Sequence, residues 1–221
     1  MYHHKWQSDV EMVLPVGKAV CVGRNYVAHA KELNNPVPNA PLLFIKPNSA
    51  LCDFGPETAI NLSLGEHHYE AELILLVGSK IDSSCTAPLR HIAGVGLGLD
   101  LTLRDLQTEL KQKGHPWETA KAFDGSGCIT PFIPVNMDTL EAGLTYQFWQ
   151  NGTLKQRGDS KYMIFSMASL LTSIAQFFTL YPGDIVMTGT PEGVGALSIG
   201  DELKLQLGGG NIYCSRVVNQ S

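Results

Sequence analysis

The sequence lacks the features that mark membrane, secreted and nucleic-acid-binding proteins. Its longest apolar runs, such as LILLV at 73–77, are far too short to span a bilayer. Charged residues make up only 17% of the 221 residues, the formal net charge is −5, and no basic stripe is present. The N-terminal stretch MYHHKWQSDVEM has no apolar segment of a secretory signal. We therefore expect no nucleic-acid partner and no membrane partner.

Cysteines are few and scattered. There are five of them, an odd number, and no two are spaced as a CxxC pair. We therefore expect neither a disulfide framework nor a zinc knuckle, and we expect the protein to work in a reducing compartment. A chain of 221 residues buries roughly 70% of its unfolded surface, so it needs no covalent cross-links to fold. We predict a soluble cytoplasmic protein.

Short β-type segments, separated by proline, glycine and asparagine, dominate the chain. Strands are expected at 18–23, 41–47, 58–63, 69–78 and 91–102. Hairpins are expected at 144–159, turning at Asn151-Gly152, and at 201–218. Helices are expected at 25–35, 102–114 and 166–180. We therefore predict an α+β fold that is predominantly β, with a few short helices.

The expected helix at 102–114 carries two separate signals. Thr102 and Asp105 have the spacing of a capping box at its start. Leu103, Leu106 and Leu110 recur at helical spacing and predict a buried apolar stripe.

Two carboxylates lie close together in the stretch HHYEAELILLVG at 67–78. In a strand Glu70 and Glu72 point to the same face, with Cα atoms roughly 6.6 Å apart. Two ionised carboxylates repel each other unless a cation lies between them. Asp100, at the end of an apolar strand, is the best third ligand, and three such oxygens suit Mg²⁺ or Mn²⁺.

Other interpretations of these acids remain open. An E-x-E pair is often the solvated face of an edge strand, although the apolar run LILLV favours a strand that is covered on both sides. His67 or His68 could join the two glutamates in a zinc site, but adjacent strand residues point oppositely, so only one of the two could do so.

Cations and polar groups follow the third acid. Arg104 and Gln107 are i, i+3 neighbours on the helix face away from the leucines, and Lys121 comes later in WETAKAFDGSG. Alone, the two cations indicate solvated helix and loop charge. Beside three carboxylates, they would compensate negative charge and let an anionic substrate approach.

Two further segments carry candidate functional residues. His29 and Glu32 are spaced i, i+3 in RNYVAHAKEL, where the carboxylate would orient the imidazole as a base for water; a surface helix contact is the alternative. TGTPEGVG at 188–195 is a glycine-rich turn that is too irregular for a P-loop. It indicates either a tight turn or a carboxylate pocket lined by Thr190 and backbone N–H groups.

Taken in order, several motifs resemble the fumarylacetoacetate hydrolase family, from about residue 17 to residue 218. The match is closest to its short branch, which includes acylpyruvate hydrolases and oxaloacetate-handling enzymes. The motifs are CVGRNYVAHAKEL, LFIKP, YEAELILLVG, GLDLTLRDLQ, PWETAKAFD and GDIVMTGTPEGVG.

The resemblance implies a mixed β-roll, usually in a homodimer, with a short extension at 1–16, one catalytic domain at 17–221 and a lid at about 25–38. It implies Mg²⁺ or Mn²⁺ held by three acids, a substrate pocket and a water-activating lid dyad. The implied metal ligands are Glu70, Glu72 and Asp100; the pocket residues are Arg104, Gln107, Lys121 and Thr190; the dyad is His29 and Glu32.

These features predict a metal-dependent enzyme acting on a small 2-oxo or 2,4-dioxo acid. The first hypothesis is hydrolysis of acylpyruvates, in which His29 activates water, the C3–C4 bond breaks through a metal-stabilised pyruvate enolate, and Lys121 helps to protonate that enolate. The alternative is an oxaloacetate keto–enol tautomerase or decarboxylase that uses the same enolate. A third possibility, from another class, is a catalytically silent binder of dicarboxylates or of a partner protein.

Overall fold

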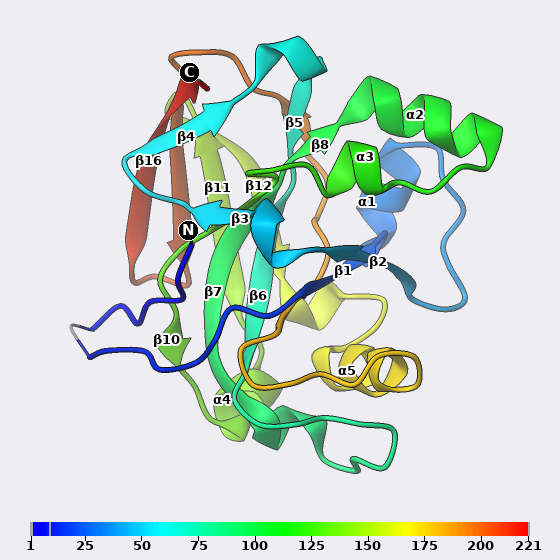
Figure 1. Cartoon of the computed structure of the whole chain (residues 1–221), viewed down its shortest axis with the longest axis vertical. Coiled ribbons are helices and arrows are strands. Elements are labelled where there is room, and N and C mark those ends of the chain that lie inside the picture. The colour runs from blue at the N-terminus through cyan, green and yellow to red at the C-terminus, as the bar shows by residue number, and fades with distance from the viewer. Residues whose placement is uncertain (1, 9, 221) are drawn as a thin grey trace.

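The computed structural model describes residues 2–8 and 10–220, which form three sheets and a few short helices (Figure 1). The largest sheet has eight strands in the order β2-β1-β13-β6-β7-β9-β3, with β10 paired to β7. Their bounds are β2 Leu42–Lys46, β1 Ala19–Gly23, β13 Ile185–Met187, β6 Ala71–Val77, β7 Ile92–Asp100, β9 Gly127–Ile129, β3 Leu51–Asp53 and β10 Ile133–Pro134.

The other two sheets are smaller. The five-stranded sheet consists of β12 Thr153–Asp159, β11 Thr145–Gln150, β15 Glu202–Leu207, β16 Ile212–Asn219 and β4 Glu57–Ile60, in that order. The three-stranded sheet consists of β14 Gly195–Ala196, β5 His67–Tyr69 and β8 Thr102–Leu103. The α+β fold class with predominant β structure is therefore confirmed.

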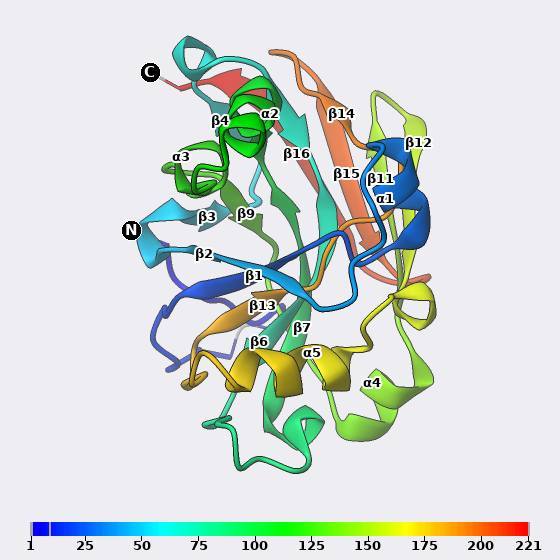
Figure 2. The same cartoon turned by 90° about the vertical axis from the view of Figure 1, so that its right-hand side faces the viewer.

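The helices are short and lie at the two ends of the sheets. Figures 1 and 2 both show α1, α2 and α3 in the upper half of the molecule and α4 and α5 in the lower half. The α-helices are α1 Val27–Glu32, α2 Arg104–Lys113, α3 Glu118–Lys121, α4 Met137–Ala142 and α5 Met167–Ala175. The 3₁₀ helices are η1 Asn48–Ala50, η2 Leu62–Leu64, η3 Pro88–His91 and η4 Ser160–Tyr162. No helix within the described ranges is long and apolar enough to cross a membrane.

Strand β6 is buried on both faces, which explains its unbroken apolar sequence. Leu73 and Leu75 pack into a core shared with Phe148 and other inward residues of the five-stranded sheet. Ile74 and Leu76 point the opposite way, into a second core. Because each such side chain contributes about 1.5–3 kcal/mol when buried, this strand anchors the fold on both sides.

Local sequence signals predict several elements correctly. The hairpin between β11 and β12 turns at Asn151 and Gly152, whose φ angles of 52° and 74° are both positive, as a type I′ turn requires. Helix α5, within the helix expected at 166–180, begins after Ser166, whose side chain caps it by accepting a hydrogen bond from Ser169 N. Sequence reasoning missed the short elements α3, α4, β3, β9, β10 and β14.

The expected capping box before α2 is wrong. Thr102 lies in β8, and its hydroxyl donates to the Asp100 backbone carbonyl at 3.2 Å. The helix begins at Arg104 after Leu103, which has no capping side chain. The pairing of β8 with β5 keeps Thr102 extended and beyond the reach of the helix N-terminus.

The expected leucine stripe of α2 is also only partly correct. Leu103 is buried, but Leu106 and Leu110 are half-buried. Gln107 is the buried residue within the helix. The fold therefore covers part of the polar face of α2 as well as its leucines.

Candidate active site

The three acids predicted as metal ligands converge where β6 begins and β7 ends. Glu70 joins β5 to β6, Glu72 is the second residue of β6, and Asp100 ends β7. Asp100 N donates to the Glu70 backbone carbonyl at 2.8 Å, which holds the two chain segments together. The three residues are only 6%, 1% and 1% exposed, and one carboxylate oxygen from each lies within 4.8 Å of the others. This burial excludes a solvated edge strand.

Two predicted cations lie directly against these acids. Lys121 Nζ lies 2.8 Å from Glu70 Oε2, 2.7 Å from Asp100 Oδ2 and 2.7 Å from Thr102 Oγ1. Arg104 Nη2 donates to Glu70 Oε1 at 2.5 Å. Burial by itself would lower the pKa of Lys121, but the charges of Asp100 and Glu70 outweigh it and raise that pKa. Lys121 therefore stays positively charged.

Sequence reasoning missed a third cation, Lys46, at the end of β2. Its side chain is fully buried, and Nζ lies 2.9 Å from Asp100 Oδ1 and 2.8 Å from Ser126 Oγ. The contact with Oδ1 is an ion pair without hydrogen-bond geometry, so that oxygen still lacks a donor. A lysine that ends an apolar strand, as in LLFIK, is the signal that could have pointed to it.

The two glutamates are in opposite electrostatic situations. Burial raises the pKa of Glu70, but the charges of Lys121 and Arg104 outweigh it and hold that pKa well below its usual range. Burial, then Asp100 and Glu70, raise the pKa of Glu72 well above its usual range. The only hydrogen bond to the Glu72 carboxylate within the described residues comes from Gly189 N, which donates to Oε2 at 2.8 Å.

The donor set fits a hard divalent cation. Three buried carboxylates are close enough to share one ion, Asp100 Oδ1 has no hydrogen-bond donor, and no cation contacts Glu72 among the described side chains. Oxygen ligands of this kind suit Mg²⁺ and Mn²⁺. The grouping includes neither His67 nor His68, so the geometry gives no support to the zinc alternative.

The predicted lid residues lie on α1 and are tied to the glycine-rich turn. His29 is buried, and its Nδ1 is 3.4 Å from Glu32 Oε2. Glu32 Oε1 accepts a hydrogen bond from Gly193 N at 2.9 Å. Before α1, Asn25 Nδ2 donates to the Thr188 backbone carbonyl at 2.8 Å, so both ends of this segment are fixed to the same turn.

A small cavity of about 30 Å³ lies beside the acids and brings most of the predicted residues together. The predicted residues that line it are His29, Glu70, Arg104, Gln107, Lys121 and Thr190. Glu32 contacts the cavity only through His29, and the other two acids lie deeper.

Thr190 supports the cavity wall rather than offering a free hydroxyl. Its Oγ1 donates to the Ala71 backbone carbonyl at 2.9 Å and accepts from Gln156 Nε2 at 2.8 Å. Gln156 also accepts a hydrogen bond from Ala71 N at 2.9 Å. This buried glutamine, which the sequence did not single out, braces the strand that carries Glu72.

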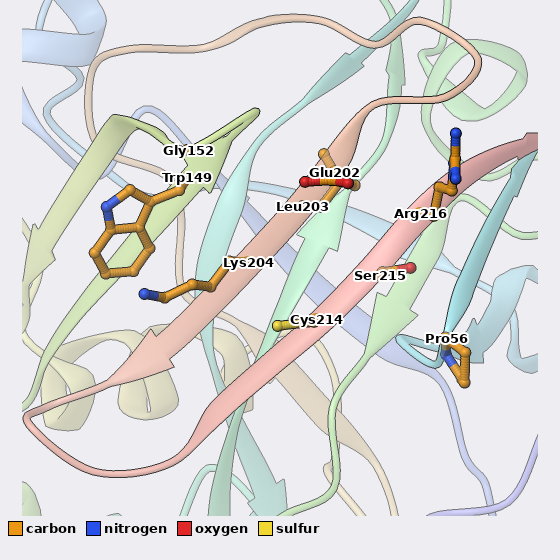
Figure 3. A pocket seen from close by; sticks show the side chains of 9 residues that line it. All are labelled: Pro56, Trp149, Gly152, Glu202, Leu203, Lys204, Cys214, Ser215 and Arg216. Carbon is orange, nitrogen blue, oxygen red and sulfur yellow. The ribbon is translucent and has the colours of Figure 1, made fainter.

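A larger hollow of about 620 Å³ lies elsewhere, over the outer face of β11, β15 and β16 (Figure 3). Trp149, Lys204, Cys214 and Arg216 line it, and Lys204 Nζ lies 4.1 Å from the centre of the Trp149 ring. Among the described residues that line it, the only acid is Glu202, which is exposed. The larger hollow therefore lacks the cluster of acids, and the small cavity beside the acids is the candidate active site.

Comparison with known proteins finds relatives that are similar over most of the chain. Oxaloacetate tautomerase YcgM of Escherichia coli is 44% identical over 209 residues, covering 94% of this chain and 95% of the relative. The mitochondrial oxaloacetate tautomerase FAHD1 of Arabidopsis thaliana is 41% identical over 191 residues, covering 84% of each chain.

Solved structures and a family model extend the similarity to nearly the whole chain. Fumarylpyruvate hydrolase from Pseudomonas aeruginosa, solved with Mn²⁺ and pyruvate, aligns with a TM-score of 0.89 at 35% identity, covering 98% of this chain and 95% of that one. The family model described as fumarylacetoacetate (FAA) hydrolase C-terminal matches residues 18–218. The chain therefore belongs to the fumarylacetoacetate hydrolase family.

Proposed function

We propose that this protein is a divalent-metal-dependent enzyme that interconverts the keto and enol forms of oxaloacetate. The observation that carries the proposal is the buried convergence of three carboxylates with Lys121 and Arg104 beside a small cavity. The sequence alone favoured hydrolysis of acylpyruvates first. The names of the curated relatives, which are 36% to 44% identical, support tautomerisation instead.

Charge balance supports an anionic substrate. The carboxylates of Glu70, Glu72 and Asp100 carry three negative charges when ionised, and Lys46, Lys121 and Arg104 carry three positive ones. A dication would leave these groups with a net charge of about +2, which favours binding of an anion.

Each residue then has a defined task. Bound Mg²⁺ or Mn²⁺, held by the three acids, would supply Lewis-acid polarisation of the 2-oxo group. Lys121 Nζ, kept charged by Glu70 and Asp100, holds a proton at the edge of the cavity and stabilises negative charge on the substrate oxygen. Arg104 fixes the orientation of Glu70, and Gln107 Oε1 fixes Arg104 by accepting from Nη1 at 2.7 Å.

Acylpyruvate hydrolysis is the second candidate, and the His29–Glu32 pair favours it. If Nδ1–H donates to Glu32 Oε2, His29 Nε2 is left without a proton and can accept one from water. A tautomerase moves a proton between carbon and oxygen and needs no attacking water. Replacing His29 by Ala should therefore abolish hydrolysis and leave the greater part of tautomerisation; loss of tautomerisation with retained hydrolysis would overturn this role of His29.

Metal dependence is tested with matched acidic variants. The EDTA-treated protein should be inactive with oxaloacetate and recover with Mg²⁺ or Mn²⁺. Glu70→Gln should lower turnover by about a hundredfold or more, because it removes a ligand and the partner of Lys121. Glu202→Gln, an exposed acid on the outer sheet, serves as the control. Full activity of Glu70→Gln, or of the metal-free protein, would refute the proposal.

Two further expectations rest on the sequence. We propose that the protein works in the cytoplasm as a homodimer. All five cysteines are free thiols, which suits a reducing compartment. Light scattering would test the dimer directly.

A further inference from the structure

One wall of the small cavity carries positive charge that no acid of the described residues neutralises. Arg24 and Lys111 line it together with Arg104 and Lys121. The only acid in the lining is Glu70, which is already paired with Arg104 and Lys121. Within the described part of the chain, neither Arg24 nor Lys111 forms an ion pair. Uncompensated cations in a cavity wall indicate a site for an anion.

The backbone holds Arg24 in a conformation that side chains rarely adopt. Its φ is +61°, in the left-handed region, which costs roughly 1–2 kcal/mol for a residue with a Cβ. The next residue, Asn25, is fully buried; it donates to the Thr188 carbonyl and accepts from Phe165 N at 2.8 Å. These bonds fix the turn, and a strained residue maintained beside a cavity indicates a functional constraint.

Lys111 reaches the same wall from helix α2. It lies one turn after Gln107 and two turns after Arg104, so all three share the covered polar face of the helix. Its Nζ donates to Asn35 Oδ1 at 3.1 Å, a neutral acceptor that leaves the charge unbalanced. Burial, then the neighbouring charges of Arg24 and Arg104, lower the pKa of Lys111.

Two aromatic side chains also line the cavity. Phe44 and Trp117 line it, with ring centres 6.3 Å apart, and the Phe44 ring lies 5.2 Å from Lys121 Nζ. The Phe44 ring offers an anionic group no hydrogen-bond donor, and Trp117 offers only its indole N–H. A second negative group on a ligand held by Lys121 is therefore drawn to the Arg24 side of the cavity.

We propose that Arg24 and Lys111 form a subsite for the carboxylate farthest from the 2-oxo group, and that they make the enzyme select dicarboxylic over monocarboxylic substrates. This assignment rests on the proposed function, because it takes the 2-oxo acid group to lie at the three acids. It adds the basis of specificity, which neither the acids nor the lid dyad supplies.

Binding of two dead-end analogues tests the subsite without turnover. Malate and lactate are both 2-hydroxy acids, and malate carries the additional carboxylate. Calorimetry with Mg²⁺ present should show malate binding at least tenfold more tightly than lactate in the unmodified protein. Arg24→Asn should bring the two affinities to within about threefold by weakening malate alone. Asparagine is chosen because it tolerates the left-handed backbone, and an unchanged melting temperature verifies the fold.

Two lysines on one helix provide the matched pair. Lys111→Gln should also weaken malate selectively, whereas Lys113→Gln should leave both affinities unchanged, because Lys113 is exposed and pairs with Glu109. Malate preference that persists in both Arg24→Asn and Lys111→Gln would overturn the subsite.

Different experimental results would refute the subsite and the proposed function. If the unmodified protein turns over oxaloacetate but Arg24→Asn keeps its malate preference, the subsite is wrong and the function stands. If the protein has no activity with oxaloacetate or acylpyruvates, yet malate preference depends on Arg24, the function is wrong and the subsite stands.

Discussion

Lys46 offers a direct test of how the buried charge cluster is held together. Its ammonium lies 2.9 Å from Asp100 Oδ1, with no exposed surface on the side chain. At an effective dielectric constant of 20, unit charges at that distance attract by about 6 kcal/mol. Lys46→Met also removes the free-energy cost of burying one ammonium group. The net cost of breaking a buried pair is therefore about 3–5 kcal/mol of unfolding free energy.

The chain contains a matched control in Lys5, whose Nζ lies 2.9 Å from Asp53 Oδ2. This pair has the same distance and the same types of charge, but the two side chains are 56% and 47% exposed. Lys5→Met should therefore cost less than about 1 kcal/mol. Comparing the two variants isolates the effect of burial.

The assay is urea unfolding in EDTA, followed by thermal melting. Lys46→Met should lower the melting temperature by roughly 6–20 °C, and Lys5→Met by less than about 4 °C. Adding Mg²⁺ or Mn²⁺ should stabilise Lys46→Met more than the unmodified protein, because Asp100 has lost a cation in the variant. Equal destabilisation by both variants would refute the reasoning.

Two other perturbations test the glycine-rich turn and the N-terminal segment. Gly189→Ala should lower the free energy of unfolding by about 1–3 kcal/mol and reduce activity, because φ is +95° and the new Cβ would lie 2.7 Å from Asn25 Cβ. Gly152→Ala is the control, because φ is +74° but the space around it is open. Urea unfolding should show a smaller loss of stability for Gly152→Ala. Burial lowers the pKa of His4 below its ordinary 6.5, so its contribution to stability is present above pH 6.5 and is lost as the pH falls through the lower folded value. The protection factors of amides in the N-terminal segment should therefore fall in acid, an effect that His4→Gln should weaken and His3→Gln, at an exposed position, should not.

Local patterns in the sequence determined much of the fold. The run LILLV predicted a strand covered on both faces, and β6 packs into two cores. Asn-Gly at 151–152 predicted the hairpin turn because few other residues accept two positive φ angles. The spacing of Glu70 and Glu72 predicted a shared face, and the burial of both is consistent with it. Signals of this kind depend on a few neighbouring residues, so they can be recognised without knowledge of the fold.

Pairings between distant segments could not be predicted in the same way. Thr102 met the local rule for a helix cap, but the pairing of β8 with β5 kept it extended. Lys46 had no local feature to link it with Asp100, and Gln156 none to link it with Thr190. Such contacts depend on which strands become neighbours, and that choice minimises the energy of the whole core.

The sequence by itself therefore determined the types of element, the family and the set of acids that could hold a metal ion. Only the tertiary structure decided the charge balance around those acids, through the buried Lys46, and the position of Arg24 in the cavity wall. The physical reason is that charge interactions depend on distance and burial in three dimensions, whereas the sequence specifies only order along the chain.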